Sequence, residues 1–244
     1  MKLKLRFLPV YPLVAWMLLV AHSTERQLRV GVGLALLGLL IRFWSNGYVG
    51  HAKVNWTQKW RGDAKIGRLV TAGPYAFVRH PLYLGSLLIG AGVCVIAGNI
   101  WVSLAAMIFV AVAYRRKMVQ EEALLLDELG VGYQRYYAAV PRWFPNGRRY
   151  AIRNGEWRWQ GIRASKEWKT IIWVVVLLIA FYFREELLQE RDWRPAAHGW
   201  HYAVLIGFGG VLIAIDLAVE CLKRFPRAGG RNAARRGRSG PLAT

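Results

Sequence analysis

The chain has 244 residues, of which 55% are hydrophobic, and it carries a formal net charge of +20. Its long apolar runs argue against a water-soluble domain, and its two cysteines, Cys94 and Cys221, cannot form a disulfide framework. The five His are scattered without the spacing of metal ligands, so no metal site is expected.

Six apolar runs predict an all-α integral-membrane helical bundle with about six transmembrane helices, since about 20 apolar residues span a bilayer. The runs cover residues 7–22, 28–48, 81–97, 100–119, 170–183 and 201–222. Only Gly98 and Asn99 separate the third run from the fourth, which indicates a tight helical hairpin. The predicted division is an N-terminal transmembrane hairpin (1–48), a core (49–169), a C-terminal transmembrane hairpin (170–222) and a basic tail (223–244) with the composition of a disordered segment.

The basic residues predict the orientation of these helices. If the N-terminus is cytoplasmic and the chain crosses six times, the outer loops contain only Arg26, Arg29, Arg184, Arg191 and Arg194. Arg42 lies within the second helix, either as a functional charge or, as we expect, with its side chain extended to the inner interface. All other Lys and Arg residues lie in inner segments, as the positive-inside rule requires. The charge therefore indicates an N-in/C-in membrane protein rather than a nucleic-acid-binding protein. We expect the membrane to be a bacterial inner membrane, although the sequence does not fix the organism.

The start of the third helix is the first candidate site. Gly73 and Pro74 indicate a turn, and Pro81 is favourable at a first helical position. The amino end of the helix attracts an anion, and Arg79, His80 and Tyr83 supply donors beside it. The alternative is a simple cytoplasmic cap with an anchoring tyrosine.

The fourth helix supplies the second candidate site, where it leaves the membrane and continues as an amphipathic helix. Gly130 or Gly132 is the predicted stop signal. Glu121 and Glu122 point about 100° apart on a helix, so they cannot share one role. We expect the two to have different partners, and Glu122 to hold a basic neighbour such as Arg142.

Two motifs in this order resemble a known family. The first runs Gly73-Pro-Tyr-Ala-Phe-Val-Arg-His-Pro-Leu-Tyr-Leu-Gly85. The second comprises Glu121-Glu122-x-x-Leu125, Leu129-Gly130-x-x-Tyr133-x-x-Tyr136 and Val140-Pro141-Arg142. They resemble the signature of the isoprenylcysteine carboxyl methyltransferase family, a group of integral-membrane methyltransferases related to the phospholipid N-methyltransferases. The resemblance covers roughly residues 60–145.

The resemblance implies a cytoplasmic site for S-adenosyl-L-methionine. Its cofactor contacts fall on Gly67, Arg68, Leu69, Val70, Tyr75, His80, Pro81, Leu82, Tyr83 and Glu121. The catalytic residues that it implies are Lys117, Glu122 and Arg142. Lys117 stands where eukaryotic members carry a substrate-binding Arg, and a lysine keeps the charge but not the bidentate fork. The acceptor is therefore not fixed as a prenylcysteine carboxylate.

We expect an S-adenosylmethionine-dependent transferase acting on a lipophilic or membrane-embedded acceptor, with a carboxylate, amine or thiol nucleophile. Its expected partners are this acceptor and membrane lipids, and not nucleic acid. One alternative is an NADPH oxidoreductase resembling membrane sterol reductases, in which Arg61, Lys65 and Arg68 would suit a 2′-phosphate. The other is a non-catalytic membrane protein with a lapsed site. The sequence leaves open the acceptor, the oligomeric state and the role of the C-terminal hairpin.

Overall fold

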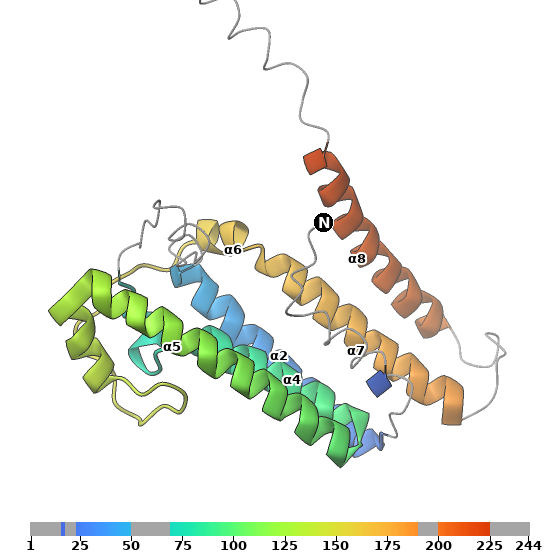
Figure 1. Ribbon diagram of the computed structural model, residues 1–244. Coiled ribbons are helices and arrows are strands. Elements are labelled where there is room, and N and C mark those ends of the chain that lie inside the picture. The colour runs from blue at the N-terminus through green and yellow to red at the C-terminus, as the bar shows by residue number, and fades with distance from the viewer. Residues whose placement is uncertain (1–15, 18–22, 50–68, 190–199, 225–244) are drawn as a thin grey trace, which may run out of the picture. The chain divides into compact units, whose positions relative to one another are not determined.

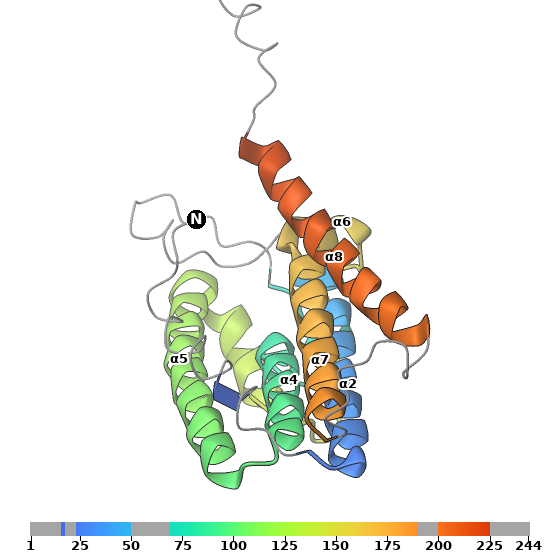
Figure 2. The ribbon, with the colours of Figure 1, turned by 90° about the vertical axis from the view of Figure 1, so that its right-hand side faces the viewer.

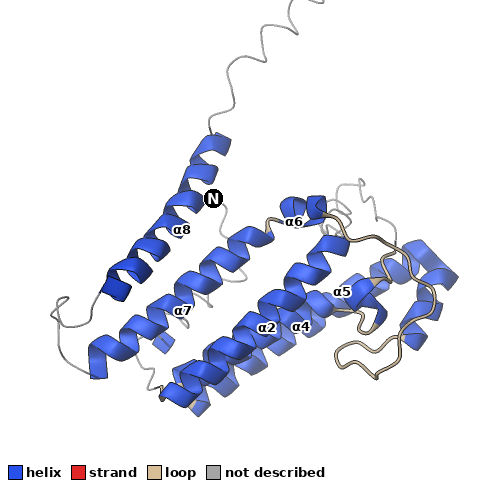
Figure 3. Cartoon of the chain, turned by 180° about the vertical axis from the view of Figure 1, so that it is seen from behind, coloured by secondary structure: helices blue, strands red, loops and turns tan. Residues whose placement is uncertain are grey.

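The computed structural model describes residues 16–17, 23–49, 69–189 and 200–224 (Figure 1). In these residues every regular element is a helix (Figure 3), which confirms the predicted all-α class. The elements are α2 (Glu25–Val49), the 3₁₀ helix η2 (Gly73–Ala76), α4 (Pro81–Ala97), α5 (Ile100–Ala139), α6 (Trp159–Ser165), α7 (Glu167–Gln189) and α8 (Trp200–Arg224). Most of the predicted first helix, the segment 50–68 and the tail from residue 225 lie outside the described residues.

The chain forms two compact units, residues 1–197 and 198–244. In its described part, the second unit consists of α8 and matches the predicted run 201–222. The predicted domain limits at residues 48, 169 and 222 stay predictions.

The hairpin of α4 and α5 forms where it was predicted. Pro81 occupies the first turn of α4, and Gly98, with φ of 68°, ends it. Asn99 caps α5, because its side-chain oxygen accepts hydrogen bonds from the N–H groups of Trp101 and Val102, both at 3.1 Å. These caps at adjacent positions account for the tight turn between the two helices.

Glycines let the backbones of α2 and α4 touch. A Cβ at Gly38 of α2 would lie 2.5 Å from the carbonyl oxygen of Gly85, and one at Gly92 of α4 would lie 2.4 Å from that of Gly31. Close packing through small residues is the usual means by which helices associate in lipid, where no hydrophobic force brings them together. Figure 2 shows α2, α4, α5 and α7 running alongside one another.

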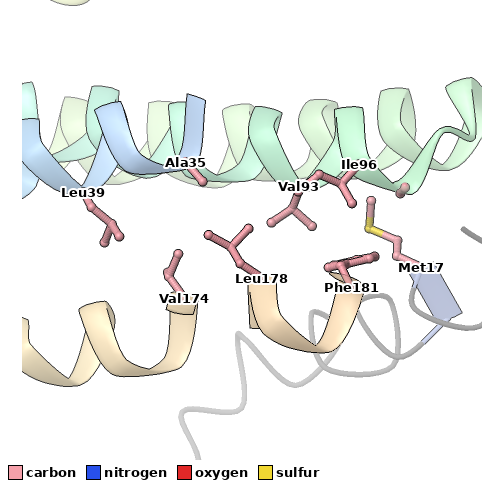
Figure 4. Close-up of a cluster of buried hydrophobic side chains, with 9 residues drawn as sticks. Met17, Ala35, Leu39, Val93, Ile96, Val174, Leu178 and Phe181 are labelled. Atoms are coloured by element: carbon pink, nitrogen blue, oxygen red, sulfur yellow. The ribbon is translucent and has the colours of Figure 1, made fainter. Parts of the chain in front are cut away.

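A hydrophobic cluster joins α7 to this pair (Figure 4). Ala35 and Leu39 of α2, and Val93 and Ile96 of α4, face Val174, Leu178 and Phe181 of α7, together with Met17. In lipid, such contacts stabilise the packing through van der Waals attraction rather than through removal of apolar surface from water. The helix α7 is therefore an integral part of the first unit.

The apolar lengths of the described helices support only part of the predicted bundle. Among the described residues, α2 alone is long and apolar enough to cross a membrane, while α4 and the stretch Ile206–Val219 are shorter apolar helices. The outward face of α2 carries the exposed side chains of Leu36, Leu37 and Leu40. Six spans remain a prediction.

Two glycines of α2 test the contact with α4. We expect Gly38→Ala to lower the free energy of unfolding by about 1–3 kcal/mol, because its methyl group would overpack against the backbone of α4. Gly33→Ala is the matched control, since nothing lies within 4 Å of a Cβ there. It should raise stability slightly, because alanine favours a helix. Thermal unfolding of both variants in detergent measures the difference, and equal effects would contradict the close contact.

Candidate functional site

The two sequence motifs meet at the start of α4. Gly73 adopts φ of 61° under the ring of Tyr48, and the turn that it opens leads through η2 to Arg79. The Arg79 N–H donates to the carbonyl of Pro141 at 2.9 Å, and the Tyr136 hydroxyl donates to the carbonyl of Tyr75 at 2.7 Å. Each bond joins the first motif to the second, so segments about 60 residues apart form one structure.

The bend in α5 makes this meeting possible. Gly130 leaves the helical conformation, with φ of 52° and ψ of −128°, and the helix then resumes and continues to Ala139. The bend brings Tyr133, Tyr136 and Val140 into a small buried cluster with Leu69. The predicted break at Gly130 is therefore confirmed as a kink, and the prediction that the helix stops there is wrong.

Glu122 is the centre of a buried ionic cluster. Its Oε1 lies 2.9 Å from both Arg79 Nη1 and His80 Nε2, and its Oε2 accepts a 2.5 Å hydrogen bond from Arg142 Nη2. The Nε of Arg142 donates to Oε1 at 3.1 Å, which makes a bidentate pair. The expected pairing of Glu122 with Arg142 is confirmed.

The charge state of Glu122 follows from these contacts. Burial alone would raise the pKa of its carboxyl, but the hydrogen bonds from His80 and Arg142, together with the charge of Arg79, lower it to about 2. Glu122 is thus ionised at neutral pH. Because an ionised carboxylate only accepts hydrogen bonds, the Nε2 of His80 carries a hydrogen.

Glu121 contacts a separate group of aromatic side chains. Its Oε1 accepts a 2.7 Å hydrogen bond from the Tyr83 hydroxyl and lies 3.7 Å from Lys117 Nζ. The Tyr83 ring packs against Tyr114 and His80, with centroid distances of 5.0 and 5.7 Å. His80 therefore touches both clusters, with its ring beside Tyr83 and its Nε2 on Glu122. The two carboxylates point in different directions, as their helical spacing predicts.

Tyr75 of η2 is also buried. Burial raises the pKa of Tyr75 well above its usual value, and the neighbouring Tyr136 and the charge of Glu121 raise it further. The phenol is therefore neutral at any physiological pH.

The other predicted cofactor-binding residues lie in the first turn of α4, beside the segment 150–158, or outside the described residues. Pro81 and Leu82 form the first turn of α4 with Tyr83. Leu69 and Val70 lie beside the segment 150–158, where Asn154 Nδ2 donates to the Leu69 carbonyl at 2.8 Å and Gly155 approaches Val70. Gly67 and Arg68 lie outside the described residues. No observation tests which of these residues bind a ligand, so their roles stay predictions.

Sequence reasoning missed two features around the site. Asn154 and Thr71 exchange hydrogen bonds, through Thr71 N–H to the Asn154 carbonyl and Asn154 N–H to Thr71 Oγ1, both at 2.9 Å. An Asn-Gly pair at 154–155 signals only a turn. The second feature is Arg42. Arg42 pairs with Glu167 at the start of α7, a partner that was not predicted, while the expectation that its side chain extends to the inner interface stays a prediction.

Comparison with known proteins identifies the part of the chain that contains most of this site. A family model described as phospholipid methyltransferase matches residues 27–129. This segment is therefore similar to the phospholipid methyltransferase family. It includes α2 except its first two residues, α4 and the first arm of α5, and therefore Tyr83, Glu121 and Glu122. Arg142 and α7 follow it.

A curated relative agrees with this family. The protein-S-isoprenylcysteine O-methyltransferase of Schizosaccharomyces pombe is 34% identical over 77 residues, which are 32% of this chain and 33% of the relative. The chain thus matches only about a third of that protein's length. No solved structure matches. The resemblance predicted from the motifs is confirmed.

The buried ionic cluster predicts a defined response to acid. The pKa of Glu122 lies below its ordinary value of 4.5 in the folded protein. Its stabilising effect is therefore complete above pH 4.5 and is lost as the pH falls toward 2. We expect Glu122→Gln to lower the free energy of unfolding by about 3 kcal/mol at neutral pH, because it leaves Arg79 and Arg142 without their counter-charge.

Denaturant unfolding of the protein and the variant between pH 2 and 7 checks this prediction. The variant should lose less stability than the parent protein on acidification. Glu121→Gln serves as the control, since Glu121 is more exposed and pairs more weakly. Equal acid sensitivity of the parent and Glu122→Gln would contradict the assignment of the ionic cluster.

Proposed function

We propose that the protein is an integral-membrane methyltransferase that uses S-adenosyl-L-methionine. The supporting observation is the assembly of both motifs around the first turn of α4, in a segment similar to the phospholipid methyltransferase family. The name of the S. pombe relative also describes a methyl transfer. The whole activity is a proposal, because the match covers only part of each chain.

The residues at the start of α4 fit the two charged ends of such a cofactor. The helix has no side-chain cap and no acidic residue in its first turn, so its positive end remains suited to a carboxylate. Glu121, at hydrogen-bonding distance from Tyr83, is suited to an ammonium group or to ribose hydroxyls. Leu69 and Val70 provide apolar surface for adenine. When bound, the cofactor would supply a methyl group carried on a sulfonium.

The side chains of this site would then act mainly by positioning. Glu122 is ionised and fully engaged, and its low pKa makes it a weak base, so we assign it to holding His80 and Arg142. Glu121 is the carboxylate on the Tyr83 side and the better candidate to accept a proton from an amine acceptor. Lys117 beside it would attract a carboxylate acceptor.

An apolar cavity supports a lipophilic acceptor. It has a volume of about 430 Å³ and is lined by Ile41, Trp44, Pro74, Phe77, Val78, Pro81, Leu84, Pro145 and Gly147. No charged side chain lines it, so hydrocarbon would be accommodated there at little cost. Since it includes Pro81, it borders the start of α4. A hydrocarbon tail in this cavity would place its polar end near the turn.

The proposed topology follows from the basic residues. Six crossings with both termini in the cytoplasm would put the turn at 73–80 and Arg142 on the cytoplasmic side, where a soluble cofactor is available. Membrane lipids would be the partners of the outer helix faces. The residues on which the NADPH alternative depends, Arg61, Lys65 and Arg68, lie outside the described residues, and no described feature favours it.

Binding of S-adenosylhomocysteine tests the cofactor site. We expect Glu121→Gln to weaken binding by about tenfold or more, because it removes a charge from the Tyr83 side of the site and a charged hydrogen bond contributes about 1.5–3 kcal/mol. Glu122→Gln should weaken it less in folded protein, since Glu122 acts only through His80 and Arg142. Calorimetric titration of both variants compares them. A larger loss in Glu122→Gln would show that the wrong carboxylate has been assigned to the cofactor.

A further inference from the structure

A second buried polar cluster joins α2, α4 and α7. Arg42 of α2 donates from Nε to Glu167 Oε1 at 2.6 Å and from Nη2 to Glu167 Oε2 at 2.9 Å. Glu167 is only 2% exposed. Asn46, one turn after Arg42, donates from Nδ2 to Glu167 Oε2 at 2.8 Å. The carboxylate is therefore held by three donors, in the bidentate geometry that arginine favours.

The same arginine reaches the first turn of α4. Its Nη1 donates to Ser86 Oγ at 2.5 Å and lies 3.4 Å from the carbonyl oxygen of Leu82. Ser86 Oγ in turn donates to that carbonyl at 2.9 Å. Tyr83, which follows Leu82 directly, holds Glu121. A shift of the guanidinium would therefore move the turn on which the proposed cofactor site is built.

Glu167 itself is fixed by the chain that follows the second motif. The Arg158 N–H donates to the carbonyl of Gly47 at 2.9 Å, and a Cβ at Gly161 would lie 2.5 Å from the carbonyl oxygen of Asn46. Phe43 packs against both Trp157 and Trp159. These contacts fasten the segment 157–161 over the end of α2, just before α7 begins at Glu167.

Electrostatics connect the two clusters as well. Besides burial and the neighbouring Tyr136, the charge of Glu121 raises the pKa of the Tyr75 phenol, while that of Arg42 lowers it. Tyr75 is thus within electrostatic reach of both Glu121 and Arg42. An arginine without its counter-charge at this distance would change the field at the start of α4.

We propose that Glu167 is a positioning residue for the cofactor site, acting through Arg42 on the first turn of α4. This inference rests on the proposed function. It gives a role to α7, which lies outside residues 27–129 and has none in the motifs. The first turn of α4 would then be held in place only when the chain that follows the second motif packs against α2.

Two variants break the link at different points. Glu167→Gln keeps the size of the side chain and removes its charge. Ser86→Ala leaves the ion pair intact and removes the shorter of the two contacts that Arg42 makes with α4. Glu156→Gln is the matched control, because Glu156 lies just before the segment 157–161, is exposed and pairs with nearby Arg158. Each full-length protein is purified in detergent, and both its melting temperature and its affinity for S-adenosylhomocysteine are measured.

We expect binding by the parent protein, a loss of about tenfold or more for Glu167→Gln and a smaller loss for Ser86→Ala, because displacements of about 1 Å at a site have effects of this order. Glu156→Gln should bind like the parent. A merely structural role would lower the melting temperature of Glu167→Gln and leave the affinity of its folded fraction unchanged, which would overturn the proposal. If Glu167→Gln does not fold, unchanged binding by Ser86→Ala overturns it equally.

The proposed function and the positioning role of Glu167 fail under different results. If the parent protein binds no S-adenosylhomocysteine, the proposed function fails and the role of Glu167 fails with it. If the parent binds and both variants bind equally well, only the positioning role fails.

Discussion

The negative charge of Glu122 is the feature on which the arrangement of the site depends. Its three partners, Arg79, His80 and Arg142, come from two segments that are far apart in the sequence. Without the shared carboxylate, the two guanidinium groups would repel each other. Because the cluster is buried, every member needs the others to offset its loss of hydration. The cluster thereby fixes the end of α5 and the segment at Val140–Arg142 against the start of α4, and it leaves Glu121 to face Tyr83.

The helices provide the frame in which that cluster forms. Glycines bring α2 and α4 into backbone contact, and the apolar face of α7 covers the pair. Within this frame, Arg42 connects α2 to Ser86 of α4 and Glu167 of α7. Ion pairs among packed helices are costly unless their geometry is good, and this one has a bidentate contact and an additional amide donor. Close helix packing and buried polar contacts thus both stabilise the first turn of α4.

Local signals in the sequence were sufficient to predict some elements of the structure and not others. Pro81, Gly98 and Asn99 define the limits of α4 and its hairpin, because each acts on its immediate neighbours. The helical spacing of Glu121 and Glu122 correctly predicted that they face different ways. Gly130 was expected to end a helix, but a glycine can also permit a bend when tertiary contacts, here those of Tyr133 and Tyr136, stabilise the second arm. The partner of Arg42 lies 125 residues away, and no local pattern could indicate it.

The measurement that tests the account most directly is transfer of a labelled methyl group from S-adenosylmethionine into a total lipid extract, followed by identification of the labelled species. The parent protein in detergent or membranes should label a lipophilic product, and Glu121→Gln should lower the yield strongly. Absence of labelling by folded protein, or tight binding of NADPH instead of S-adenosylhomocysteine, would contradict the assignment of a methyltransferase site at the start of α4.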